Sequence, residues 1–310
     1  MLKKALFIYF IFFSICLLQG EESVEYSSSE WKDIDGKELS IFVNSENKSK
    51  RKADGSRKAP FKSIEAAFTH LNGLKEKDIK ATIHITGSFT SKNVYVITFP
   101  TKIVGVDDGK TSYDKKASSH INFEKNAGFV VTSSKLFIEK CTISRREFAD
   151  EPRSVPILYS SNSFINIKNV TLTAKEGGTV FSFIESDVMM DSLIVNSNQS
   201  GYYCNVLKTT KSNLKIKDVY LNCNGRFVLA IDSNASFLSA ERLHCNINAH
   251  ISANVLKANA GSVNIQNSFF YAEGKDFKKD VAIIYDAKTK LETKDIELKG
   301  FVNESKIEKE

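Results

Sequence analysis

The chain has 310 residues, of which 42% are hydrophobic and 26% are charged, and its formal net charge is +6 at pH 7. This length can support a large hydrophobic core without disulfides, and the mild positive charge argues against a nucleic-acid partner. The five histidines have no metal-ligand spacing, and no nucleotide or phosphate motif occurs, so we expect neither a cofactor nor a metal site.

The first 20 residues predict a secretory signal. Lys3 and Lys4 precede an apolar run at 5–18, which is too short to cross a membrane comfortably but suits a signal core. We expect cleavage after Gly20, no transmembrane span after that cleavage, and a secreted or cell-surface protein. A lipoprotein acylated at Cys16 and an uncleaved membrane anchor remain alternatives.

Residues 21–40 are polar and predict an irregular segment, with the only tryptophan at Trp31. A basic cluster follows in one expected loop. Its members are Lys48, Lys50, Arg51, Lys52, Arg57 and Lys58. Such a cluster is either a solvated loop or a contact for an anionic glycan, so Lys50, Arg51 and Lys52 are candidate ligand-binding residues.

Residues 41–90 predict a strand, a helix and a second strand. The run 41–44 is strand-like, and Ile64, Ala67, Phe68 and Leu71 have the spacing of one helix face. The segment 83–89 alternates as a strand does and includes a glycine at 87. Residues 94–123 then predict the first, less regular coils of a repetitive structure.

Residues 129–298 contain seven repeats of a five-position apolar pattern. The repeats are anchored at Leu136, Ile165, Val188, Leu214, Leu238, Val263 and Leu291. The other four positions lie seven residues before each anchor and two, five and seven residues after it. Of these 35 positions, 33 are hydrophobic, the exceptions being Ser268 and Thr293. Composition alone would give roughly 15, so the pattern indicates a structural repeat.

The spacing within each repeat predicts short strands joined by bends. Steps of two follow strand periodicity, whereas the step of three breaks the alternation and requires a bend. A small residue, usually serine, lies two positions before each anchor, which is typical of a turn. Asn196, Asn222 and Asn246 occupy equivalent positions and predict stacked, hydrogen-bonded amides.

The cap and the repeat together resemble the pectin-lyase-like family of right-handed parallel β-helix proteins. The resemblance rests on Asp54-Gly55-Ser56, on the segment 60–64 before an alanine-containing helix, and on the repeat, and it covers about residues 41–300. It implies an all-β solenoid of about nine to ten coils, with a cap at 41–90, a β-helix at 91–300 and a short N-terminal helix closing one end. Residues 301–310 form a charged tail that we expect to be frayed.

The resemblance implies a family whose enzymes act on polysaccharides, but the catalytic and calcium-binding residues of those enzymes are not found in this sequence. A calcium-binding lyase needs clustered carboxylates, whereas the position three after each anchor alternates in sign. Those residues are Glu139, Lys168, Asp191, Lys217, Glu241, Gln266 and Lys294. The hydrolases of the family carry paired aspartates and a Gly-His-Gly, and neither occurs. No catalytic residue can be assigned.

Two surfaces remain as ligand-binding candidates. Ile194, Tyr220, His244 and Phe269 lie six residues after successive anchors, and we call them the aromatic stripe. Rings in a row suit sugar faces or a partner surface, although a covering loop or strand propensity would also explain them. The longest gap between anchors holds Arg145 and Arg146, which we expect in an exposed loop.

The favoured interpretation is a secreted or cell-surface β-helix that binds a glycan or a host or matrix surface without catalysis. A polysaccharide lyase or glycoside hydrolase with unrecognised residues is one alternative, and a purely structural surface module is the other.

Overall fold

The structure is a computed structural model. It describes residues 30–48, 51–74, 78–105, 119–124, 126–145, 155–175, 178–274, 281–301 and 307–309, without the side chains of 199–202 and 308. The elements are η1 (Trp31–Asp33), β1 (Lys37–Asn44), α2 (Ile64–Asn72), β2 (Ile79–Ser91), β3 (Val94–Ile97), β4 (Thr101–Gly105), β5 (Ser119–Phe123), β6 (Gly128–Thr132), β7 (Lys135–Arg145), β8 (Leu158–Ser161), β9 (Phe164–Lys175), β10 (Gly178–Ile184), β11 (Asp187–Thr210), β12 (Asn213–Glu273), β13 (Ile283–Tyr285), β14 (Thr289–Lys299) and β15 (Ile307–Lys309).

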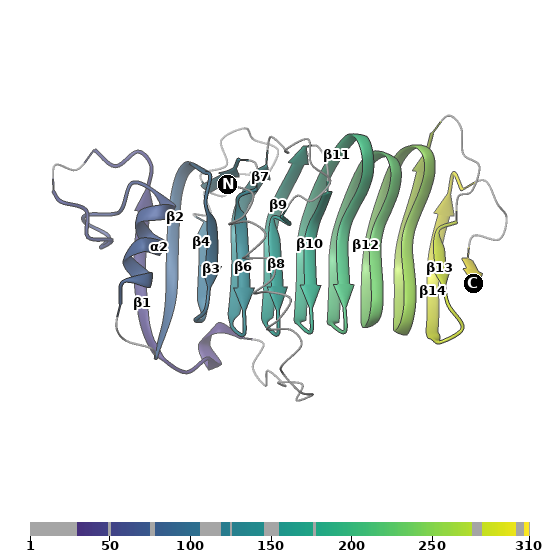
Figure 1. The fold of residues 1–310 in the computed structure, drawn as a ribbon, viewed down its shortest axis with the longest axis horizontal. Coiled ribbons are helices and arrows are strands. Elements are labelled where there is room, and N and C mark those ends of the chain that lie inside the picture. The colour runs from purple at the N-terminus through teal and green to yellow at the C-terminus, as the bar shows by residue number, and fades with distance from the viewer. Residues whose placement is uncertain are drawn as a thin grey trace, which may run out of the picture.

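The chain folds as an all-β parallel β-helix, as the sequence predicts. Every pairing between the named strands is parallel, and successive coils advance along one axis (Figure 1). The register joins the predicted anchors directly, because Leu136 pairs with Ile165, Ile165 with Val188, and Val188 with Leu214. Each predicted position is therefore a column of stacked side chains.

Two columns of left-handed residues bend the coils. Fully extended, the 61 residues of β12 would span roughly 200 Å, so β12 must wind through several coils. The first bend lies three residues before each of the first six anchors, at Ser133, Asn162, Glu185, Lys211, Ala235 and Ala260. The second lies four residues after it, at Lys140, Asn169, Ser192, Asp218, Arg242, Asn267 and Asp295. The non-glycine residues with positive φ in the described chain all belong to these two columns, so the left-handed conformation makes these two bends of the coil.

The interior is built from the predicted apolar columns. Every predicted inward position of the first six repeats is buried, including Ser268, whereas none of the five in the last repeat is. Leu291 and Leu298 in β14 are only half-buried, because β14 pairs with β12 alone.

The prediction that Ile284 is the inward residue of the last repeat is wrong. Ile283, not Ile284, stacks on Leu256, and Ile284 lies opposite Lys257. The cause is the turn before β14, where Asp286 accepts hydrogen bonds at Oδ1 from the backbone N–H groups of Ala260 and Lys288. This turn is one residue longer than the bend in the preceding coils, so counting back from the anchor misses the register.

A buried serine ladder fixes the first bend. Ser163, Ser186, Ser212 and Ser236 each donate the hydroxyl to the carbonyl two residues earlier, at 2.7–2.9 Å. Each also accepts the backbone N–H of the serine one coil earlier, at 3.1–3.3 Å. The ladder stops at Gly261, where a Cβ would lie 2.2 Å from the carbonyl oxygen of Ser236. A side chain is therefore excluded there by the backbone of the coil before.

The N-terminal end is covered by α2, which lies beside β1 and β2 (Figure 1). Ser63 caps the helix by accepting the N–H of Ala66 at 3.1 Å. The predicted face of Ile64, Ala67, Phe68 and Leu71 is buried. Phe68 stacks on Tyr95 of β3 with ring centroids 4.5 Å apart. This packing joins the helix to the interior of the first coils.

The segment before β1 is more ordered than the irregular stretch predicted for 21–40. Trp31 packs edge-on against Phe137 of β7 at 5.3 Å, and Phe137 lies 5.5 Å from Phe164 of β9. Lys80 anchors this segment by donating to the carbonyl of Ile34 at 2.8 Å. The aromatic side chains of these outward positions are thus covered by the chain itself.

The end of the chain also differs from expectation. The predicted frayed tail contains β15, which pairs with β13. The four cysteines of the described residues, Cys141, Cys204, Cys223 and Cys245, are buried free thiols. The predicted signal at 1–20 lies outside the described residues. Within the described chain, no helix combines the length and apolarity that a membrane crossing requires.

Candidate functional site

The aromatic stripe lies on the outward side of the coils. Ile194 pairs in register with Tyr220, and Phe269 pairs with Glu297 of the last coil. Tyr220 and His244 stack with ring centroids 4.5 Å apart and an interplanar angle of 6°. Tyr220 is 44% exposed, so a tyrosine ring is available to solvent at the middle of the stripe.

The bend just before the stripe holds adjacent coils in line. Arg242 and Asp218 occupy the same bend column, and they form a bidentate ion pair with N···O distances of 2.5 and 2.9 Å. Hydrogen bonding to Arg242 lowers the pKa of Asp218, and the same contact raises the pKa of Arg242. Tyr220 and His244 each follow this bend by two residues, so the ion pair joins the two coils next to the two stacked rings.

The predicted asparagine stack is present beside the stripe. Asn222 donates its side-chain N–H to Oδ1 of Asn196 at 2.8 Å, and Asn246 donates to Oδ1 of Asn222 at 3.0 Å. These amides alternate with the buried Leu221 and Cys223, so they face outward. The stack therefore forms part of the surface rather than the interior.

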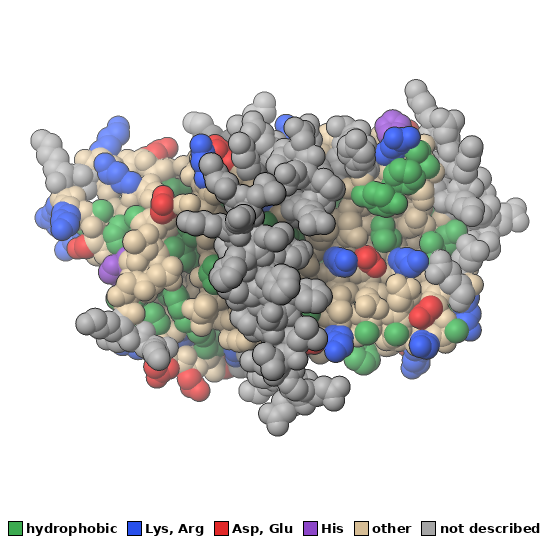
Figure 2. Space-filling model, in the orientation of Figure 1, with side chains coloured by type: hydrophobic (Ala, Val, Ile, Leu, Met, Phe, Trp, Pro, Cys, Tyr) green, Lys and Arg blue, Asp and Glu red, His purple; other side chains and the backbone are tan. Residues whose placement is uncertain are grey.

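A second aromatic pair was not predicted from the sequence. Tyr203 and Phe227 pair in register and stack with ring centroids 5.1 Å apart, at an angle of 17°. Tyr203 is 66% exposed, and the guanidinium carbon of Arg226 lies 5.9 Å from the Phe227 ring centre. Figure 2 shows hydrophobic side chains gathered over β11 and β12, near basic side chains and a histidine. The signal was available, because both residues lie eleven positions before an anchor.

One of the basic residues predicted to bind a ligand, Arg145, lies in the interior. Arg145 is completely buried, because β7 continues to it and places it in register between Phe123 and Ala174, in an inward column. Its Nη1 donates to the carbonyl of Val155 at 2.5 Å, and burial lowers the pKa of Arg145 to about 10. Arg145 is therefore not a surface ligand-binding residue, and that prediction is wrong.

The remaining basic candidates lie near the N-terminal end. Arg51 and Lys52 are exposed before α2, and Figure 2 shows basic side chains at that end. Lys50 and Arg146 lie outside the described residues.

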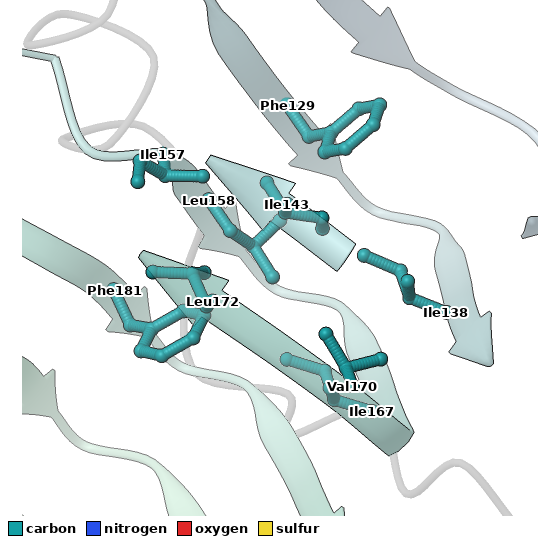
Figure 3. A pocket seen from close by; sticks show the side chains of 9 residues that line it. All are labelled: Phe129, Ile138, Ile143, Ile157, Leu158, Ile167, Val170, Leu172 and Phe181. Atoms are coloured by element: carbon teal, nitrogen blue, oxygen red, sulfur yellow. The ribbon is translucent and has the colours of Figure 1, made fainter. Parts of the chain in front are cut away.

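One cavity in the interior of the described chain is too small for a ligand. An apolar void of about 10 Å³ lies between the coils of β6 to β10 (Figure 3). Its lining comprises Phe129, Ile138, Ile143, Ile157, Leu158, Ile167, Val170, Leu172 and Phe181. A volume of this size holds one water at most, and apolar walls give that water no partner. Among the described residues, no three His, Cys, Asp or Glu side chains group as metal ligands.

Comparisons with known proteins identify no family for this chain. No family model matches the chain, and no curated protein matches it. A solved structure, the crystal structure of Dettilon tailspike protein (gp208), is similar at 9% identity. The match covers 83% of this chain and 68% of that chain, with a TM-score of 0.20. A TM-score this low carries no argument about function.

Proposed function

We propose that the protein is a secreted or cell-surface β-helix that binds a glycan or a surface through the outer side of its coils, without catalysis. The observation that carries this proposal is the stacked pair of Tyr220 and His244, with Tyr220 exposed on a regular face. Flat rings bind the apolar faces of sugars, and a binding surface without a deep pocket suits an extended ligand. The apolar run at 5–18 supports export.

The contrast with Phe137 and Phe164 strengthens the proposal. Those outward rings are buried beneath the segment that carries Trp31. The chain thus covers one outward aromatic cluster and leaves the ring of Tyr220 exposed. Strand propensity explains why an aromatic residue occurs in a strand, but it does not explain this difference in covering.

The test compares two variants of the purified protein. The double variant Tyr220→Ser and Phe269→Ser removes two rings of the stripe, and Phe237→Ser is the matched control. Phe237 is 61% exposed and lies at another column of the coil. Binding is measured on a glycan array and on immobilised polysaccharides, and folding is checked by thermal melting.

We expect the double variant to melt like the wild type and to bind at least several-fold more weakly, because each lost stacking contact is worth about 1 kcal/mol. Phe237→Ser should bind as the wild type does. Unchanged binding by the folded double variant would reject the stripe and favour the exposed basic loop that includes Arg51 and Lys52. Shortening of a polysaccharide during incubation would show an enzyme instead.

A further inference from the structure

The coils that carry the stripe also carry an outward surface of asparagine side chains. Its nine residues, which we call the amide face, are Ile194, Asn196, Asn198, Tyr220, Asn222, Asn224, His244, Asn246 and Asn248. They form three rows of three, one from each successive coil. The register places Ile194, Asn196 and Asn198 directly against Tyr220, Asn222 and Asn224. The bond from Asn246 to Asn222 joins the third row.

The amide face carries no charged side chain, with His244 counted as neutral. A chain with 26% charged residues would place about two charges among nine positions at random, and outward positions usually carry more. Other outward positions of the same coils do carry charge. Lys208 pairs in register with Asp232, and Lys168 forms an ion pair with Asp191 at 3.5 Å. The lack of charge is therefore a property of this face and not of the coils in general.

The amides have hydrogen-bonding capacity to spare. A primary amide has two N–H donors and two acceptor lone pairs, and the ladder of Asn196, Asn222 and Asn246 uses one donor and one acceptor at each internal link. The three asparagines lie on the outer side of the coil, since Asn246 is exposed, Asn196 and Asn222 are half-buried, and their inward neighbours are buried. Because the ladder already fixes the orientation of these side chains, a ligand would meet groups that lose little freedom on binding.

We propose that the amide face binds a neutral polysaccharide whose chain lies across successive coils. Sugar hydroxyls donate and accept hydrogen bonds, as the free groups of the asparagines do, and the ring of Tyr220 offers a face for stacking. Neighbouring coils are about 4.8 Å apart, so similar contacts recur along an extended ligand. An acidic polysaccharide would instead need cationic partners for its carboxylates; the nine residues provide none, and the one lysine in register with them, Lys175 beside Asn198, lies at the edge of the face. This inference rests on the proposed function and specifies the class of its ligand.

The test measures binding of short oligosaccharides by calorimetry. The probes are neutral hexasaccharides of glucose, mannose and N-acetylglucosamine, and a hexasaccharide of galacturonate. The variants are Asn222→Asp in the ladder and Asn224→Asp, whose side chain takes part in no ladder bond. Asn234→Asp is the matched control, because Asn234 is exposed outside the amide face. Asn198 and Asn234 each begin an Asn-x-Ser sequon, so the protein is produced without N-glycosylation to keep both side chains unmodified.

We expect the wild type to bind at least one neutral hexasaccharide more tightly than the galacturonate. Each substitution in the amide face should weaken that binding about five-fold, the effect of one lost hydrogen bond, while Asn234→Asp leaves it unchanged. Tighter binding of galacturonate would overturn the inference and leave the proposed function standing. Equal binding by all three variants would also overturn it. If no glycan binds to the wild type in any assay, glycan binding as the proposed function fails as well, and only binding to another surface is left.

Discussion

Removing one hydroxyl from the serine ladder tests how the bends are held. In Ser212→Ala, the buried N–H of Ser186 loses its acceptor, which is 3.1 Å away in the wild type. The carbonyl of Thr210 loses the hydroxyl donor at 2.9 Å but keeps the N–H of Glu185 at 2.9 Å. Only one buried backbone group is therefore orphaned, and that costs about 1–3 kcal/mol in the free energy of unfolding.

The assay has a global and a local readout. Urea unfolding should show a loss of about 2 kcal/mol for Ser212→Ala. Hydrogen exchange should show faster exchange at the amide of Ser186, since its hydrogen-bond acceptor has been removed. Ser239→Ala serves as the control, because Ser239 is exposed in the next coil, and it should change stability by less than about 0.5 kcal/mol. Equal stability of the two variants, with Ser186 still protected, would refute the role of the ladder.

Three further substitutions probe the core, the bends and the cap. Ile216→Asp buries an unpaired charge at a residue that is 3% exposed and should cost at least about 3 kcal/mol, whereas the outward Lys215→Asp should be nearly silent in the same urea titration. Ala235→Gly should raise the free energy of unfolding by up to about 1 kcal/mol, because Ala235 has φ of 49° and glycine adopts this conformation without strain. Any loss of stability in Ala235→Gly would contradict the strain at this bend. Burial lowers the pKa of His84 below 6.5, so the folded state binds fewer protons than the unfolded state; stability should fall as pH drops from about 6.5 through the folded pKa, and His84→Phe should flatten that fall in urea midpoints measured from pH 7.5 to 5.

The inward columns could be predicted because stacking repeats the same requirement in every coil. An apolar residue at a fixed step from the anchor is buried wherever the turn between it and the anchor has the same length as in the neighbouring coils. The prediction fails at Ile284, because the turn that Asp286 organises is one residue longer. Local turn chemistry, which the spacing alone does not reveal, shifts the register there.

The candidate surfaces were harder to predict. Arg145 lies in a charged stretch of sequence that is typical of a loop. However, β7 extends two residues beyond the last predicted column, at Ile143, and places the guanidinium of Arg145 in the interior. Tyr203 and Phe227 were missed because only the column seven residues before each anchor was aligned on that side of the coil, and theirs lies eleven residues before. Trp31 gave no signal either, since its contact with Phe137 joins segments far apart in sequence. Whether an outward side chain is exposed depends on which distant segments of the chain pack over it, and the local sequence does not reveal this.

The difference between the two ends of the solenoid has a mechanical consequence. At one end α2 is packed onto the interior, whereas at the other β14 leaves Leu291, Ile296 and Leu298 half-exposed. A force applied to the last coil would break the hydrogen bonds between one pair of neighbouring coils at a time. After each step, the next coil would be exposed at the end of the solenoid in the same way. Pulling from the opposite end must detach Trp31 from Phe137, then β1 from β2, and then α2 from the interior. The force needed to unfold the molecule should therefore be higher when it is pulled from its N-terminal end than from its C-terminal end.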